Sequence, residues 1–135
     1  MNDLVWYLLN FALDHNINYE LQKLPPYFES RALPQENFII INTNWHRTNE
    51  IPFIVGHEIG HIMNHDNIER CQPQNASYPL ELAADKYSLN LIFKYTLKMD
   101  SMIQEPQTFI EQFGIPERML IPAKELFKNN KELIF

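Results

Sequence analysis

Residues 51–63 have the strongest helical pattern in this chain. Thr48 or Asn49 can cap the start of a helix here, and Pro52 would fall in its first turn, where a missing N–H does little harm. Apolar side chains then recur at the spacing of one helix face: Ile51, Ile54, Val55, Ile59, Ile62 and Met63. This period predicts a helix that is buried on one side and can line a cleft with the other.

The same helix carries the sequence His57-Glu58-Ile59-Gly60-His61. Two imidazoles four residues apart lie on one helix face, about 5–6 Å apart at Cβ, and can bind one Zn²⁺ ion together. Glu58 lies one step round the helix from His57 and can act as a base toward a water at the metal. The segment therefore predicts a zinc site with Glu58 as its catalytic residue.

A third ligand has to come from elsewhere, because a catalytic zinc takes three protein ligands and leaves one position open. Glu81 opens the next stretch of helical apolar period, and Asp85 shares its helix face. We expect Glu81 to be the third ligand. Asp85 can then accept the free ring N–H of His57 or His61, which would fix the orientation of that ring.

His65 is the alternative third ligand. A histidine ligand after this motif requires glycine at position 64 and histidine at position 67, where the chain has Asn64 and Asn67. His65 therefore stays a candidate donor to the transition state, or a residue that ends the helix. Tyr78 is the other candidate donor, whereas Tyr87 is expected to pack in the core.

Four segments resemble the ImmA/IrrE-type zinc metallopeptidases. Residues 57–65 resemble the family's H-E-L-G-H-x-x-x-H segment, and residues 81–87 resemble its E-x-E-A-N-x-F-A segment. Residues 37–42 resemble the strand before its zinc helix, and residues 113–116 its F-G-V-S turn. The family has Glu, Asn and Ala where this chain has Ala83, Asp85 and Ser88. The resulting E-x-x-A-D form is shared with other gluzincins.

This resemblance implies a small zincin-like peptidase with one Zn²⁺ per chain, held by His57, His61 and Glu81. It also implies an antirepressor of a phage or mobile element, which cleaves a helix-turn-helix repressor. A zinc-binding regulatory module that binds a repressor without cleaving it would have the same ligands. A peptidase of general specificity is a third interpretation.

Length, charge and cysteine content narrow the class of protein. A chain of 135 residues with 45% hydrophobic residues predicts one globular domain over residues 1–135. No apolar run approaches the length of a membrane span. The net charge of −6 argues against direct nucleic-acid binding but is compatible with a basic protein partner. The single cysteine, Cys71, fits a reducing cytoplasm and is expected to be an incidental thiol.

The remaining patterns predict an α+β domain. Its parts would be an N-terminal helix at residues 2–14, a short antiparallel sheet, two metal-binding helices and C-terminal helices. The strands are expected at 17–22, 27–33 and 38–41, a loop at 66–79, and later helices at 106–113, after Pro116 and at 124–135. We expect strand 37–42 to form a sheet edge to which a peptide can add. The alternative is that this strand is central and fully paired.

Overall fold

Five α-helices and a three-stranded sheet make up the part of the chain that the computed structural model describes. This part covers residues 2–65, 74–99 and 105–130, with the side chains of residues 74–78 excepted. The main elements are α1 (Asp3–Asp14), β1 (Asn18–Gln22), β2 (Arg31–Leu33), β3 (Phe38–Asn42), α2 (Ile51–Met63), α3 (Gln74–Lys98), α4 (Pro106–Gln112) and α5 (Leu120–Asn129). Short 3₁₀ turns lie at η1 (Pro34–Glu36), η2 (Thr48–Glu50) and η4 (Glu117–Met119).

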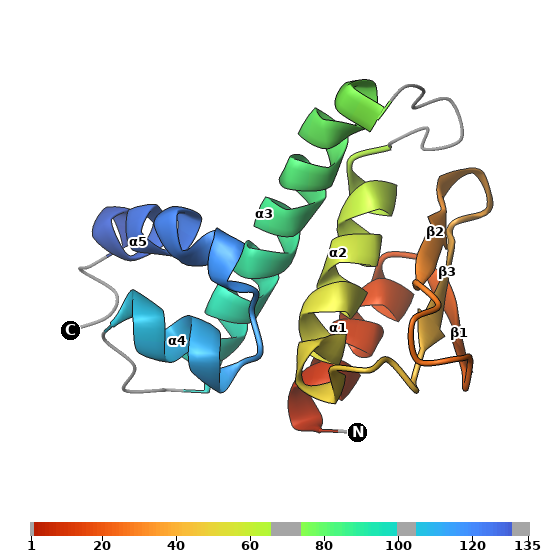
Figure 1. The fold of residues 1–135 in the computed structure, drawn as a ribbon, viewed down its shortest axis with the longest axis horizontal. Coiled ribbons are helices and arrows are strands. Elements are labelled where there is room, and N and C mark those ends of the chain that lie inside the picture. The colour runs from red at the N-terminus through yellow and green to blue at the C-terminus, as the bar shows by residue number, and fades with distance from the viewer. Residues whose placement is uncertain (1, 66–73, 100–104, 131–135) are drawn as a thin grey trace.

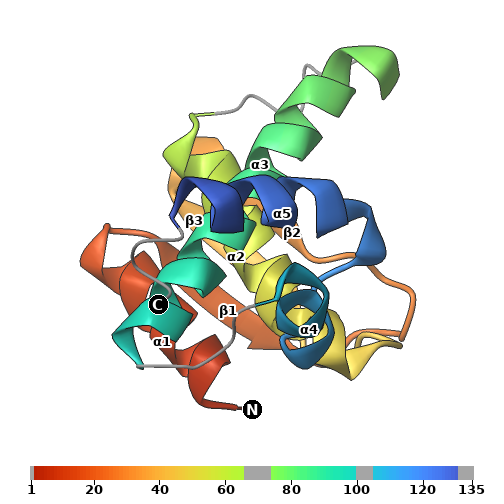
Figure 2. The same cartoon turned by 90° about the vertical axis from the view of Figure 1, so that its left-hand side faces the viewer.

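Helix α2 occupies the centre of the molecule. It contacts β2 and β3 on one side and α3 on the other, and α1 packs against both helices. The resulting order is the sheet, then α2, then α3, with α4 and α5 beyond (Figure 1). Figure 2 shows α4 and α5 from their own side of the molecule. The predicted apolar face of α2 is confirmed, because Ile51, Val55, Ile59 and Ile62 are all buried.

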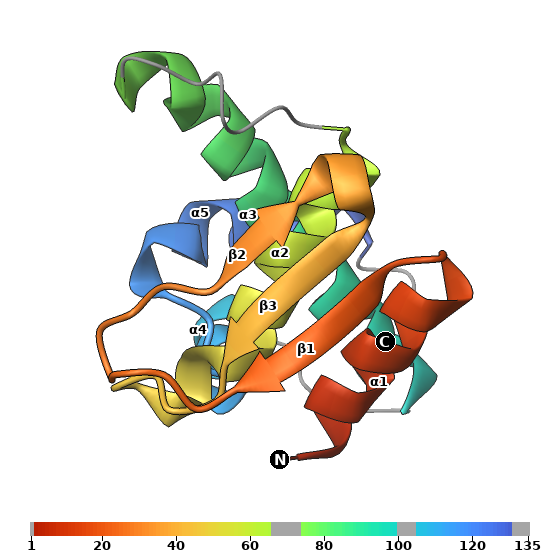
Figure 3. The same cartoon turned by 90° about the vertical axis from the view of Figure 1, so that its right-hand side faces the viewer.

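The sheet is mixed, with the strand order β1-β3-β2 (Figure 3). Strand β3 pairs with β1 in parallel and with β2 antiparallel, so the prediction of a wholly antiparallel sheet was wrong. Parallel neighbours require a long connection, and residues 23–37 supply it. The prediction that strand 37–42 forms an edge was also wrong. Its Ile39 and Ile41 are fully buried, and the edges are β1 and β2.

The second strand is shorter than predicted, because residues 27–30 form a loop before β2. The buried side chain of Asn42 donates from Nδ2 to the carbonyls of Pro25 and Phe28, at 2.8 Å each. Its Oδ1 accepts from the backbone N–H groups of Leu24 and Asn44, at 3.0 and 2.9 Å. One amide side chain thus satisfies backbone groups that a strand would have paired with a neighbour.

Two helices begin earlier than predicted. Helix α3 starts at Gln74 and contains Pro79, so the predicted loop at 66–79 is shorter. Pro79 removes one helical hydrogen bond near the helix start, and the buried apolar face beyond it sustains the helix. Helix α5 begins at Leu120 and accommodates Pro122 in its first turn, where no N–H is needed. Cys71 lies outside the described residues.

The remaining helix boundaries follow the sequence closely. Asn2 caps α1 by accepting from the backbone N–H of Val5, at 3.0 Å. The position before α2 is Glu50, with no side-chain cap, so Thr48 and Asn49 are not the N-cap; they belong to η2. Gly114 follows α4 with a φ of 67°, as its role in ending that helix requires.

No helix among the described residues is long and apolar enough to cross a membrane.

Candidate metal centre

His57 and His61 point into the same site from α2. Their Nε2 atoms are 3.0 Å apart, and their ring planes stand at 88° to each other. His61 is only 2% exposed, whereas the His57 side chain is 16% exposed. The prediction that the two rings share one helix face is confirmed.

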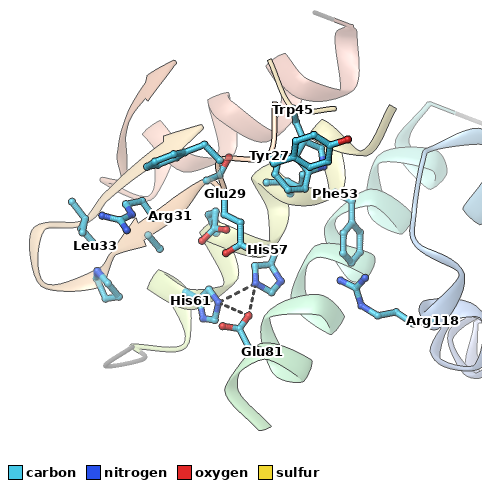
Figure 4. A pocket seen from close by; sticks show the side chains of 16 residues that line it. Tyr27, Glu29, Arg31, Leu33, Trp45, Phe53, His57, His61, Glu81 and Arg118 are labelled. Atoms are coloured by element: carbon cyan, nitrogen blue, oxygen red, sulfur yellow. Dashed lines mark hydrogen bonds and ion pairs between the residues drawn. The ribbon is translucent and has the colours of Figure 1, made fainter. Parts of the chain in front are cut away.

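Glu81 reaches the same point from α3. Its Oε2 lies 2.7 Å from Nε2 of His57 and 3.2 Å from Nε2 of His61. Figure 4 shows the three side chains pointing toward one another among the residues that line a pocket. The structure therefore brings together the three residues that the sequence predicted as metal ligands.

The three donor atoms fit a single divalent ion. All of them lie within 4.8 Å of one another. A tetrahedral zinc ion with bonds of about 2.0–2.2 Å separates its donor atoms by roughly 3.3–3.6 Å. The observed separations of 2.7–3.2 Å become suitable after a small outward movement of the side chains. Two imidazole nitrogens and one carboxylate oxygen also leave a fourth position open for water or substrate.

Small residues allow α2 and α3 to approach closely enough for this arrangement. A Cβ atom added at Gly56 would lie 2.9 Å from Cβ of Ser88. One added at Gly60 would lie 3.0 Å from the carbonyl oxygen of Ala84. The first distance is shorter than real Cβ contacts and the second is tighter than almost all of them, so these two glycines set the spacing of the helices. That spacing places Glu81 opposite the two histidines.

Asp85 fixes the outer side of the His57 ring. Its Oδ1 lies 2.8 Å from Nδ1 of His57, and the Asp85 side chain is 9% exposed. With Nδ1–H donated to Asp85, the lone pair of Nε2 is directed at the site. Arg118 in turn donates to both oxygens of Asp85, from Nε at 3.1 Å and from Nη2 at 3.2 Å. The predicted contact between Asp85 and a histidine is confirmed.

Glu58 lies beside the ligands and is 8% exposed. Burial is the largest influence on its carboxyl group and raises the pKa to about 7, and the nearby Glu81 and Glu29 act in the same direction. The charges of His57 and His61 oppose this effect. A carboxyl group that titrates near neutral pH can both accept and return a proton.

Two carboxylates surround the His57 ring. Burial alone would lower the pKa of His57, but hydrogen bonds to Asp85 and Glu81 outweigh it and raise the pKa to about 10. Hydrogen bonds from His57 and His61 hold the pKa of Glu81 well below its usual range. Burial would raise the pKa of Asp85, but its bonds to His57 and Arg118 prevail and lower it. In the metal-free site, the proton on His57 therefore offsets the negative charges of Asp85 and Glu81. A bound cation can replace this proton.

A pocket of about 950 Å³ opens beside the three ligands. Its sheet-side wall is formed by β2 and the loop before it, and its helical wall by α2 with Glu81 and Arg118. Aromatic side chains contribute to the lining: Tyr27, Phe28, Trp45 and Phe53. His57, His61 and Glu81 therefore line the same pocket as strand β2.

The described part of the structure places neither predicted transition-state donor in this pocket. His65 lies beyond the end of α2, exposed, with a φ of 57°, and does not line the pocket. The Tyr78 side chain lies outside the described part of the chain. Tyr87 packs against the core, as predicted, and its ring centroid lies 6.5 Å from that of Phe11.

Two polar residues that support this site were not predicted from the sequence, Arg118 and Asn42. Arg118 follows Asp85 by 33 residues and belongs to a 3₁₀ turn, so no periodicity connects them. Asn42 ends an apolar strand, where a polar residue is ordinary. An asparagine directly after three consecutive isoleucines was the available signal for Asn42, because an amide at a buried position needs partners.

The chain was also compared with known proteins. It matched no protein-family model, no curated protein and no solved structure. The metal centre is therefore defined by the geometry of its own residues.

Proposed function

We propose that this protein is a zinc-dependent endopeptidase, with His57, His61 and Glu81 as ligands and Glu58 as base. The observation that carries the proposal is the position of Glu58. It is a buried carboxyl group beside three converging donor atoms, and its pKa is about 7. A site that only stored a metal ion would not need such a group next to an open coordination position.

The residues divide the chemistry of peptide hydrolysis among them. Zinc, when bound, supplies a Lewis acid that polarises the substrate carbonyl and lowers the pKa of water. Glu58 accepts the proton of the attacking water and returns it to the leaving amine. Asp85 keeps the His57 ring in the orientation that ligation requires, through the 2.8 Å contact at Nδ1.

The pocket favours an extended peptide as substrate. Strand β2 is an edge of the sheet and lines the pocket through Arg31, Ala32 and Leu33. A peptide that pairs antiparallel with β2 would place its N-terminal part near Leu33 and its C-terminal part toward Arg31. Figure 4 shows Phe53 and Arg118 on the opposite side of the ligands from Leu33. Residues after the cleaved bond would therefore meet Phe53 and Arg118.

The proposed substrate is a regulatory DNA-binding protein, cut in an extended linker. The resemblance of residues 57–65 and 81–87 to the ImmA/IrrE-type peptidases supports a helix-turn-helix repressor. The site itself supports a linker, because addition to a sheet edge requires a segment with free backbone groups. The net charge of −6 is compatible with a basic partner of this kind.

The test combines the protein with any helix-turn-helix repressor that is encoded beside its gene, with zinc present. We expect discrete fragments on a gel, and none after chelation. Glu58→Gln should keep the metal and reduce the cleavage rate by at least about a hundredfold. Glu125→Gln, at an exposed position on α5, is the matched control and should cleave normally.

Two outcomes would replace this proposal. A stable, uncut complex with the repressor would identify a zinc-binding regulatory module. Rapid digestion of unfolded casein with no preference for the repressor would identify a peptidase of general specificity. Full cleavage by the Glu58→Gln variant would refute the assignment of Glu58 as the base.

A further inference from the structure

Arg118 connects the C-terminal part of the molecule to the metal centre. It belongs to η4, between α4 and α5, and lines the same pocket as the ligands. Its guanidinium group also lies over the Phe53 ring, 5.8 Å from the ring centroid. The side chain is thus held between an aromatic ring of α2 and a carboxylate of α3.

The contact with Asp85 has a definite geometry. Two N–H groups of Arg118 meet the two oxygens of Asp85, at 3.1 and 3.2 Å. Such a two-point contact fixes the plane of the carboxylate, which a single hydrogen bond would not do. One of these oxygens also contacts Nδ1 of His57 at 2.8 Å. The chain of contacts therefore runs from Arg118 through Asp85 to a proposed metal ligand.

We propose that Arg118 is a positioning residue for the metal centre, acting on His57 through Asp85. With the carboxylate plane fixed, Asp85 holds the His57 ring so that Nε2 faces Glu81 and His61. Without Arg118, the carboxylate can rotate, and the ring loses part of its orientation before metal binding. This inference rests on the metal centre of the proposed function and does not depend on peptide cleavage.

A general contribution of Arg118 to stability does not explain these contacts. Its side chain is 61% exposed, and ion pairs at such positions contribute little to the free energy of unfolding. Direct action on the reacting carbonyl is also disfavoured by the geometry. Asp85 lies between the guanidinium group and His57, and it contacts the ring on the side away from the metal-binding Nε2.

The test measures the dissociation constant of zinc by competition with a chromophoric chelator. We expect Arg118→Gln to weaken zinc binding by about 10- to 100-fold, the usual range for residues that orient a metal ligand. Arg118→Lys should recover only part of this loss, because an ammonium group cannot make the two-point contact. Arg31→Gln is the matched control. It removes the same charge from the opposite wall of the pocket and should change the constant by less than about twofold (Figure 4).

A double-mutant cycle tests whether Arg118 acts through Asp85. In the Asp85→Asn background, Arg118→Gln should weaken zinc binding by less than about twofold. The visible absorption bands of the Co²⁺-loaded protein should shift with Arg118→Gln and stay unchanged with Arg31→Gln. A loss of equal size in both backgrounds would overturn the proposal. So would an unchanged zinc affinity with a reduced cleavage rate, which would make Arg118 a group that acts on the substrate.

The failure of this inference can be told apart from the failure of the proposed function. If wild-type protein binds no zinc, or if His57→Ala binds it equally well, the metal centre itself is refuted. If zinc binding shows the predicted coupling but no peptide is cut, the positioning role of Arg118 stands and the peptidase proposal fails.

Discussion

The two walls of the pocket are built in different ways. The helical wall consists of α2 and α3, which meet where Gly56 and Gly60 leave room for Ser88 and Ala84. The sheet-side wall includes residues 24–30, a loop attached to the sheet by the side chain of Asn42. The three proposed metal ligands thus lie on closely packed helices. By contrast, Tyr27 and Phe28 of the loop are 76% and 49% exposed.

This difference assigns separate tasks to the two walls. Ligation requires donor atoms held within tenths of an ångström, and closely packed helices provide that precision. Contact with a substrate side chain tolerates more freedom, and loops on a rigid scaffold commonly provide it. The two walls should therefore respond independently to mutation. Damage to the helix contact should abolish metal binding, and damage to the loop should spare it.

The largest expected effect is the stabilisation of the protein by zinc. At a free concentration about a thousandfold above the dissociation constant, zinc should raise the free energy of unfolding by about 4 kcal/mol. Glu81→Ala should lose most of this gain, because two ligands remain. Denaturant unfolding with and without zinc measures it, with the exposed Glu125→Ala as control. An equal gain in the Glu81→Ala protein would rule out Glu81 as a ligand.

Hydrogen exchange can sharpen the contrast between the two walls. Zinc should slow the exchange of amide protons in the facing parts of α2 and α3, which it connects through His57, His61 and Glu81. The amides of residues 24–30 should change much less, because no ligand lies on that loop. Equal protection of both walls would show that they form one cooperative unit.

The second prediction concerns the pH dependence of the metal-free protein. Because the folded state raises the pKa of His57 from 6.5 to about 10, its stabilising contribution is complete below about pH 6.5. That contribution is lost as the pH rises toward 10. The free energy of unfolding should fall by on the order of 2 kcal/mol between pH 7 and pH 9.

Variants and metal can test the origin of this pH dependence. His57→Gln should remove it, and His15→Gln, at an exposed position after α1, should keep it. Zinc should also flatten the profile, because a coordinated imidazole stays deprotonated. Denaturant unfolding at each pH provides the measurement. An unchanged slope in the His57→Gln protein would place the titrating group elsewhere.

The third prediction tests the contact between α2 and α3. Gly56→Ala forces a Cβ atom toward Ser88 and should destabilise the protein by about 1–3 kcal/mol. Zinc binding should weaken at least tenfold, since Glu81 moves away from the histidines with α3. Gly56→Ala combined with Ser88→Gly should restore part of both losses. Recovery would be incomplete, because Ser88 also donates to the carbonyl of Phe53 at 2.7 Å.

The helical wall was easier to predict from the sequence than the sheet, because its pattern lies within one short segment. The ligands on α2 repeat at helical spacing, and a zinc site needs a third donor, so local pattern and chemistry identified His57, His61 and Glu81. The sheet depended on which strands pair, and no local pattern specifies that β1 runs parallel to β3. The apolar side chains of strand 37–42 fit a central strand as well as an edge.

Polar contacts between distant segments were the least predictable part. Arg118 and Asp85 are connected only because η4 and α5 pack against α3. Asn42 likewise binds a loop 14 to 18 residues earlier in the chain, through groups of the backbone that every residue has. Their partners became evident only with the tertiary structure. His65 is the opposite case, in which a local pattern misled. Its position two helical turns beyond His57 suggested a transition-state donor, but α2 ends before His65.

The smallest effect on zinc binding concerns the loop, and it bears most directly on the independence of the two walls. Asn42→Ala removes four side-chain hydrogen bonds, two accepted and two donated, and three of them order residues 24–30. The freed backbone groups lie near the surface and can turn to water, so we expect a loss of about 2 kcal/mol in the free energy of unfolding. Asn90→Ala, which removes one exposed hydrogen bond to Lys86, is the matched control and should cost much less.

The decisive comparison is between zinc affinity and substrate affinity in the Asn42→Ala protein. Zinc affinity should change by less than about twofold, because α2 and α3 keep their contact. The KM for a peptide substrate should rise, because Tyr27 and Phe28 lose their fixed position on the pocket wall. If zinc affinity fell together with the rise in KM, the loop would be holding the metal site as well. Substrate binding and zinc binding would then both depend on this loop, and the independence of the two walls would be refuted.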